Sequence, residues 1–184
     1  FLLFSTAQAL NVTLFKQLLL DYHNHLRAIH DAPRVVYDPN LDNSAYRWDL
    51  RISIYGFFYS NLLIHTGGEN IYFIWSTSPV SEHTLARNAM KAFYEEIQFY
   101  NYDRPGLIIR AAHFTNLVWK AVQKMGVGVY IQNYENRHGA CNVQASPSRP
   151  ATGYMVVVHL GPAGNIMTSE EFTENVRRPN QVFN

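Results

Sequence analysis

The chain has 184 residues, 47% hydrophobic and 16% charged, so its composition is that of one globular domain and excludes a disordered polymer. Its formal net charge of +1 at pH 7 excludes the broad basic field that nucleic-acid binding requires. No apolar run is long enough to span a bilayer. Cys141 is the only cysteine, so no intrachain disulfide can form, which favours a reducing compartment or a core that needs no covalent cross-link.

The first ten residues differ from the rest, and one domain is expected over residues 11–184. An apolar run followed by Ala7-Gln8-Ala9 fits the end of a signal peptide, and the alternative is a plain apolar N-terminal arm. Asn11-Val12-Thr13 follows at once and is an acceptor for N-glycosylation at Asn11. Both features indicate a secreted protein, against the direction of the cysteine count.

A helix is predicted over residues 14–31, because apolar side chains recur at the spacing of one helix face. They are Phe15, Leu18, Leu19, Tyr22, Leu26 and Ile29. The same segment carries three histidines and an arginine, namely His23, His25, His30 and Arg27. These form either a basic helix face or, as we favour, caps and surface packing. Pro33 ends the helix.

A second helix is predicted from a cap at Asp38 to about Ile54. It is expected to bury Leu41, Ala45, Trp48 and Ile52. The aromatic and aliphatic stretch over 55–64 should be buried as well. Residues 65–70 are predicted to be a loop, in which two glycines bring His65 close to Glu69. Residues 71–75 are predicted to be a buried strand or extended segment.

A third helix is predicted over residues 81–100, with Ser81 as its cap. An α-helix turns by about 100° per residue, so the apolar side chains of this segment gather on one face. They are Leu85, Ala86, Ala89, Met90, Phe93, Ile97 and Tyr100. Glu95 lies nearly opposite that face, whereas Glu96 lies on its flank. Helix geometry therefore predicts that Glu96 points inward and Glu95 towards solvent.

A fourth helix is predicted near His113, followed by an alternating strand at 127–131 and an almost wholly apolar strand at 154–160. The polar loop at 133–152 contains Cys141, and residues 177–180 should be exposed. Apolar strands need cover on both faces. The order of elements therefore predicts an α/β fold, a single-domain three-layer α-β-α sandwich.

Four stretches in register resemble the CAP superfamily of cysteine-rich secretory, venom-antigen and pathogenesis-related proteins. They are His65–Asn70, Phe93–Ile97, Ala112–Trp119 and Pro162–Asn165. The resemblance runs from about Phe15 to Val176 and implies the CAP fold. In its lack of disulfides the chain is similar to the Golgi-associated plant pathogenesis-related branch, although it shows no myristoylation signal.

The resemblance implies that His65, Glu69, Glu96 and His113 meet in one cleft. Asn116 stands where the family usually has a glutamine, which shortens the reach of the amide at the rim. Two neutral imidazoles, His65 and His113, suit Zn²⁺ or another divalent ion, and a carboxylate can orient a ligating imidazole. Such a site should be weak and should lose metal on acidification, because histidines protonate near pH ~6.5.

Two other interpretations of these residues stay open. The four groups could act as general acid and base in a hydrolase, with Thr115 or Ser76 as nucleophile, but no Gly-x-Ser-x-Gly elbow supports this. They could also form a polar network that only fixes the loops. The remaining histidines His83, His138 and His159 are assigned a surface or core role.

We expect a secreted, non-enzymatic CAP domain that binds a ligand or a protein partner. The resemblance implies a sterol, fatty acid or anionic lipid as ligand, and the many aromatic side chains predict an apolar groove separate from the histidine cleft. The alternatives are a metal- or His/Glu-dependent hydrolase and an intracellular, membrane-associated module. The sequence indicates no nucleic-acid partner and no particular oligomeric state.

Overall fold

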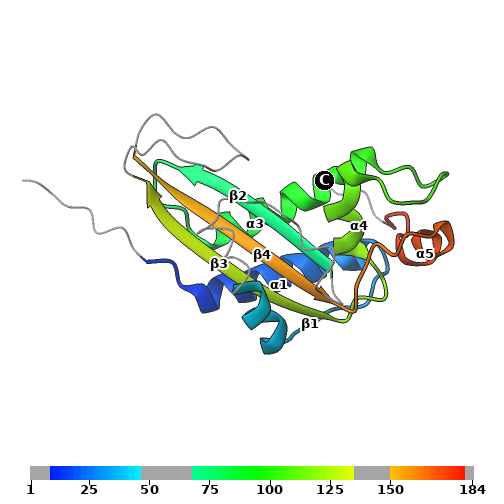
Figure 1. Ribbon diagram of the computed structural model, residues 1–184, viewed down its shortest axis with the longest axis horizontal. Helices are drawn as coiled ribbons and strands as arrows, with labels where there is room; N and C mark the ends of the chain where they lie inside the picture. The colour runs from blue at the N-terminus through cyan, green and yellow to red at the C-terminus, as the bar shows by residue number, and fades with distance from the viewer. Residues whose placement is uncertain (1–8, 47–67, 135–149, 181–184) are drawn as a thin grey trace, which may run out of the picture.

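A four-stranded sheet forms the centre of the structure, with helices packed on both of its faces (Figure 1). The computed structural model describes residues 9–46, 68–134 and 150–180. The strand order is β1 (Val36–Tyr37), β3 (Lys124–Tyr134), β4 (Ala151–Gly161) and β2 (Gly68–Ser76). β1 is parallel to β3, and the other neighbouring pairs are antiparallel. β4 is thus a central strand, as its apolar sequence predicts.

Successive side chains of β4 point to opposite faces of the sheet. Val156 and Val158 enter the main core, which is shared with α1 (Val12–Ile29), α3 (Glu82–Glu95) and α4 (Ala112–Val118). Met155 and Val157 enter a smaller core with Ala45, which lies on a helix over residues 39–46. These two cores make the fold a three-layer α-β-α sandwich, as predicted.

The first helix has the predicted apolar face but also buries polar groups. Asn11 caps α1, since its side chain accepts a hydrogen bond from the backbone N–H of Leu14. His23, Arg27 and His30 are each at most 1% exposed. The favoured interpretation was caps and surface packing. Its surface part is wrong for these three residues, because they are buried, whereas His30 is the C-cap of α1.

The third helix begins after its Ser81 cap, as predicted, but it ends five residues early. α3 stops at Glu95, and a 3-10 helix, η1 (Glu96–Phe99), continues the chain. A second 3-10 helix, η2 (Ile109–Ala111), leads directly into α4. The change from α-helix to the tighter 3-10 helix at Glu96 sets the direction of the Glu96 carboxylate.

The predicted loop over residues 65–70 is wrong for its second half. Gly68, Glu69 and Asn70 are the first residues of β2 and pair with Leu160, His159 and Val158 of β4. His65 lies outside the described residues. The same holds for other positions named in the predictions, which are Trp48, Ile52, the stretch 55–64 and Cys141. The helix predicted from Asp38 is present over 39–46, and the Asp38 carboxylate accepts the N–H of Asn40.

The chain closes with α5 (Ser169–Asn175), whose cap is Thr168, and an extended segment over residues 177–180. That segment is exposed, as predicted, yet it is hydrogen-bonded to the end of α1. The N–H of Asn180 donates to the Ile29 carbonyl at 2.8 Å. Within the described ranges, no helix is both long and apolar enough to cross a membrane.

Candidate functional site

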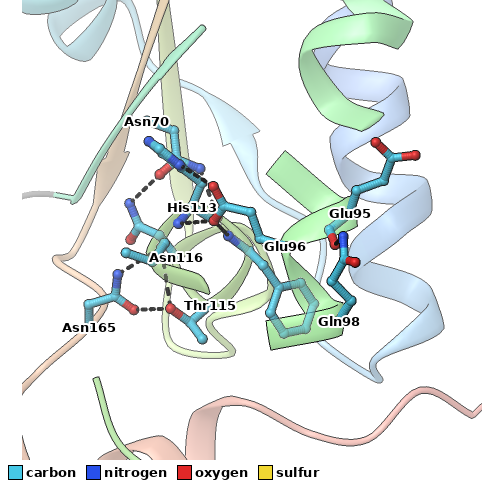
Figure 2. Close-up of polar contacts among 10 residues, drawn as sticks. Asn70, Glu95, Glu96, Gln98, His113, Thr115, Asn116 and Asn165 are labelled. Carbon is cyan, nitrogen blue, oxygen red and sulfur yellow. Dashed lines mark hydrogen bonds and ion pairs between the residues drawn. The ribbon is translucent and has the colours of Figure 1, made fainter. Parts of the chain in front are cut away.

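The carboxylate of Glu96 and the imidazole of His113 lie in direct contact, and they are two of the predicted site residues (Figure 2). Oε1 of Glu96 lies 2.7 Å from Nδ1 of His113. Oε2 accepts the backbone N–H of His113 at 2.9 Å and that of Phe114 at 3.3 Å. Both oxygens of the carboxylate are thus held by the first turn of α4, where unpaired backbone N–H groups are available.

The local structure explains why Glu96 rather than Glu95 makes this contact. Glu96 is the residue at which α3 gives way to η1, and its side chain is 21% exposed. Glu95 is 58% exposed and faces Lys91 on the outer side of α3. Figure 2 shows the two carboxylates pointing in different directions. The prediction from the helix wheel is confirmed.

The ring of His113 is held on one side and open on the other. It stacks on Phe93 with a centroid distance of 5.2 Å and an interplanar angle of 26°. The side chain is 39% exposed, and its Nε2 makes no hydrogen bond to any residue that the structure describes. A carboxylate bonded to Nδ1 fixes the proton there, so the lone pair of Nε2 faces outward.

An amide network lies behind this pair. Asn70 of β2 donates to the backbone carbonyl of His113 at 2.9 Å, and Asn116 donates to the side-chain oxygen of Asn70 at 3.0 Å. Asn165 donates to the Ala112 carbonyl at 2.9 Å (Figure 2). The network joins α4 to β2 and to the segment after β4, and so fixes the position of the His113 backbone.

Asn116 is a buried spacer in this network as well as a donor. An added Cβ on Gly68 would clash with its Oδ1, and one on Gly164 would lie 2.6 Å from the same atom. The amide is 2% exposed, and its Oδ1 has no hydrogen-bond partner within the described segments. The short asparagine therefore fits a space that the two glycines leave open. It was predicted at the rim of the cleft, but it lies in the interior.

Glu69 is not brought to the Glu96–His113 pair, although the predicted cleft included it. Neighbouring residues of a strand face opposite sides of the sheet, and Asn70 points towards α4. Glu69 therefore points to the other side, where its Oε2 lies 3.0 Å from Nε2 of His159. Nδ1 of His159 in turn lies 2.6 Å from the hydroxyl of Ser44.

The two suggested nucleophiles are both engaged elsewhere. The hydroxyl of Thr115 is buried and donates to Asn165 at 2.7 Å. Ser76 donates to the Ser78 carbonyl at 2.6 Å. It stands six residues along β2 from Asn70, which is about 20 Å at the usual rise of a strand. Neither hydroxyl is hydrogen-bonded to the imidazole of His113.

The buried arginine on α1 supports α4 from the opposite end. Arg27 is 0% exposed, and burial lowers its pKa to about 10, so it stays charged at neutral pH. Its guanidinium donates to five backbone carbonyls at 2.7–3.4 Å. They belong to Pro33, Leu117, Trp119, Lys120 and Val122. Arg27 thus binds together the turn that connects α4 to β3.

Two histidines beside Arg27 are neutral for the same physical reason. Burial, with a smaller contribution from the charge of Arg27, lowers the pKa of His23 to about 3. Burial also lowers the pKa of His30, although the Arg177 carbonyl and Asp31 oppose the shift. His30 bonds to that carbonyl at 2.7 Å and to the Tyr94 hydroxyl at 3.0 Å. Neither imidazole is available as an acid or base at the surface.

The predictions of a second imidazole, of a metal site and of glycosylation remain. His65, which would be the second imidazole of the metal site, lies outside the described residues. Within the described part of the chain, no group of three or more His, Cys, Asp or Glu side chains is placed to hold a metal. Asn11 is exposed at the start of α1, so its glycosylation stays a prediction.

Sequence reasoning missed Asn70, Ser44 and His159. Asn70 follows Glu69 directly, and the strand boundary alone decides which of the two faces α4. His159 and Ser44 meet only through the pairing of β2 with β4 and the packing of the helix at 39–46. A polar residue inside the apolar run of β4 was the one available signal for His159, because buried histidines need partners.

A model of the cysteine-rich secretory protein family, CAP, matches residues 20–144. That span is more than half of the chain, and the chain belongs to this family.

Relatives within the family extend the likeness to nearly the whole chain. The human Golgi-associated plant pathogenesis-related protein 1 is 28% identical over 172 residues, which cover 90% of this chain and 94% of that protein. Secreted protein RBT4 of Candida albicans is 29% identical over 177 residues, or 91% of this chain but 42% of RBT4. The chain therefore spans less than half the length of this fungal relative.

Solved structures share the fold. The crystal structure of NaASP2 with Zn²⁺ superposes with a TM-score of 0.61 and covers 96% of this chain and 90% of that one. The two sequences are 20% identical. The likeness therefore concerns the arrangement of helices and sheet.

Proposed function

We propose that this chain is a secreted CAP domain that binds a ligand or partner, and that its Glu96–His113 pair is half of a weak, non-catalytic divalent-metal site. RBT4, a relative named as secreted, supports the extracellular location. A Golgi-associated relative keeps open the alternative of an intracellular, membrane-associated module. N-terminal sequencing of the mature protein separates the two, since only the secreted form loses a signal peptide.

The metal proposal is supported by the 2.7 Å contact between Nδ1 of His113 and Oε1 of Glu96. This contact leaves Nε2 as a metal ligand in the arrangement typical of carboxylate–histidine–zinc sites. His65 is the second ligand in this proposal. With two protein ligands, the metal would keep sites open to water or anions, and it would supply an electrophilic anchor for an anionic ligand.

Calorimetric titration with Zn²⁺ at pH 7.5 and 5.5 tests the site. We expect weak binding at pH 7.5 and weaker binding at pH 5.5, because protons compete with the metal for imidazole. His113→Ala should abolish binding, and Glu96→Gln should weaken it by about 10–100-fold, the usual cost of losing the group that orients a ligand. The exposed His83 provides the control His83→Gln. Equal affinity at both pH values, or in His113→Ala, would contradict the proposal.

A second binding function is favoured by the outer face of β2. Ile71, Phe73 and Trp75 are half-buried on the sheet face away from α4, and the rings of Phe73 and Trp75 lie 4.9 Å apart. Half-buried apolar side chains of this kind suit a hydrophobic ligand such as a sterol or fatty acid. We propose that such a ligand binds on this face, separately from the Glu96–His113 pair.

Competition between labelled cholesterol and labelled palmitate tests the second function. Phe73→Ser should reduce binding at least several-fold, whereas His113→Ala should leave it unchanged. Absence of binding of both labels at micromolar protein would contradict lipid binding. Loss of binding in a folded His113→Ala variant would contradict the separation of the two sites.

A further inference from the structure

Three polar side chains lie in line on the sheet face opposite the Glu96–His113 pair. Oε2 of Glu69 is 3.0 Å from Nε2 of His159, and Nδ1 of His159 is 2.6 Å from Oγ of Ser44. They come from β2, β4 and the helix at 39–46, so three distant segments supply one carboxylate, one imidazole and one hydroxyl. This is the order of groups that activates a serine nucleophile.

The protonation pattern of the line follows from its geometry. An ionised Glu69 accepts the N–H at Nε2, which leaves the lone pair of His159 on Nδ1, directed at Ser44. The serine hydroxyl has two acceptors within reach, Nδ1 at 2.6 Å and the Leu41 carbonyl at 2.8 Å. Rotation of one hydroxyl therefore connects the serine proton to the imidazole.

The imidazole and the carboxylate are more buried than the serine hydroxyl, as a serine nucleophile with a buried base requires. His159 is 4% exposed, and the Glu69 side chain is 14% exposed, whereas Ser44 is half-buried. Oε1 of Glu69 is buried without a hydrogen-bond partner among the described residues. A carboxylate that is incompletely hydrogen-bonded in a low-dielectric site stabilises a positive charge next to it strongly, here the imidazolium that forms when Ser44 loses its proton.

The surrounding side chains indicate the kind of acyl group. Met155 and Val157 alternate with His159 on the same face of β4, and Ala45 follows Ser44 on the helix. Ile71 and Phe73 pack against this apolar cluster from β2. Met155, Val157 and Ala45 are buried, so an apolar acyl chain would lie against the half-buried Ile71 and Phe73, which follow Glu69 on the same face of β2.

We propose that Ser44, His159 and Glu69 form an acyl-transfer site for carboxylic esters of apolar acids. Oγ of Ser44 attacks the ester carbonyl while Nδ1 of His159 takes the hydroxyl proton. The C–O bond to the alcohol breaks, and His159 returns the proton to the departing alkoxide. Water then attacks the Ser44 ester with the same base, which releases the carboxylic acid and restores the serine. This site is independent of the proposed metal site.

Covalent labelling of the full chain tests the proposal. An alkyl fluorophosphonate, which reacts with activated serines, should add its phosphonyl mass to the peptide that contains Ser44. The labelling rate should rise with pH, because the reaction needs a neutral imidazole. Ser44→Ala should abolish the adduct, and His159→Gln and Glu69→Gln should each slow it at least 10-fold.

The exposed Ser78 provides the matched control, and Ser78→Ala should label at the wild-type rate. Circular dichroism melts identify any variant that fails to fold, and the pH dependence of the wild-type rate remains a test in that case. An unlabelled Ser44, a pH-independent rate, or equal labelling in a folded His159→Gln variant would overturn the proposal. Zinc titration of Ser44→Ala should match the wild type, so failure of this site leaves the metal proposal standing.

Discussion

At the scale of single residues, Arg27 is the clearest case of a buried charge held by neutral groups. Its guanidinium is satisfied by carbonyls from a turn about ninety positions away in sequence, and by Pro33 nearby. A planar fork with five N–H donors can reach several carbonyls at once, whereas the ammonium of lysine cannot. The residue therefore acts as a structural centre, and its carbonyl partners depend on it.

Replacement of Arg27 by lysine should lower the free energy of unfolding by about 3 kcal/mol, because several buried carbonyls lose their donor. Urea unfolding at pH 7 measures the change. The exposed Arg87 on α3 serves as the control, and Arg87→Lys should stay within about 0.5 kcal/mol of the wild type. A similarly small effect at Arg27 would show that the carbonyls find other partners.

The buried histidines predict a loss of stability on acidification. His23 is neutral in the folded state down to about pH 3, and the pKa of His30 is also lowered, whereas both protonate near pH 6.5 when unfolded. Between these values the unfolded state binds more protons, so the free energy of unfolding falls as the pH falls. Each histidine contributes a slope of up to about 1.4 kcal/mol per pH unit.

Unfolding curves from pH 7 to pH 4 measure that slope. His23→Gln cannot titrate, so its slope should be shallower than that of the wild type even where its overall stability is lower. His83→Gln, at an exposed position, should keep the wild-type slope. Identical slopes for wild type and His23→Gln would contradict a neutral, buried His23.

Prediction at this scale succeeded where the cause is local and failed where it is not. The choice of Glu96 over Glu95 depends only on the turn of one helix, and it is confirmed. The burial of Arg27 depends on carbonyls from another part of the chain, and arginine is mostly exposed in proteins, so sequence reasoning put it at the surface.

At the scale of elements, the residue at which β2 begins determines which side chains meet at the Glu96–His113 pair. A loop over residues 65–70 leaves Glu69 free to join Glu96 and His113. A strand from Gly68 assigns Glu69 and Asn70 to opposite faces. The predicted loop would allow a single cleft, whereas the observed strand places one polar group on each face of the sheet. The start of such a strand is fixed by its pairing with β4 rather than by local sequence.

The contact between β2, α4 and the segment after β4 predicts a coupled effect of glycine substitutions. Gly164→Ala would press a Cβ against Asn116 and Trp119, at a cost of about 1–3 kcal/mol for overpacking. In an Asn116→Ala background the cost should be smaller, because the obstructing amide is gone. Thermal unfolding of the four proteins of the double-mutant cycle measures the coupling.

Gly106 provides the control for this prediction, since an added Cβ there meets nothing within 4 Å. Gly106→Ala should therefore leave stability unchanged or slightly raised. Additive effects of Gly164→Ala and Asn116→Ala would show that the two residues do not compete for the same space.

At the scale of the whole molecule, the layers were predictable and the connections between them were not. The apolar run of β4 and the periodic helices require a sheet covered on both faces, and the structure has one. The strand order β1-β3-β4-β2 depends on long-range pairing that no local pattern encodes. The exposure of residues 177–180 was predicted from their polarity, but their attachment to α1 was not.

The attachment of residues 177–180 to α1 should contribute to the stability of the fold. The C-terminal segment is tied to the helical layer by the Arg177 carbonyl at His30, by Arg178 at Asp103 and by the Asn180 backbone at Ile29. Deletion of residues 177–184 should lower the free energy of unfolding by about 2–4 kcal/mol, because several hydrogen bonds are lost and His30 loses its buried acceptor. Arg178→Ala should cost less than about 1 kcal/mol, since its ion pair with Asp103 is exposed. Urea unfolding of the full chain and both variants at pH 7 measures these changes, and a truncated protein as stable as the full chain would show that α1 holds its position without the segment.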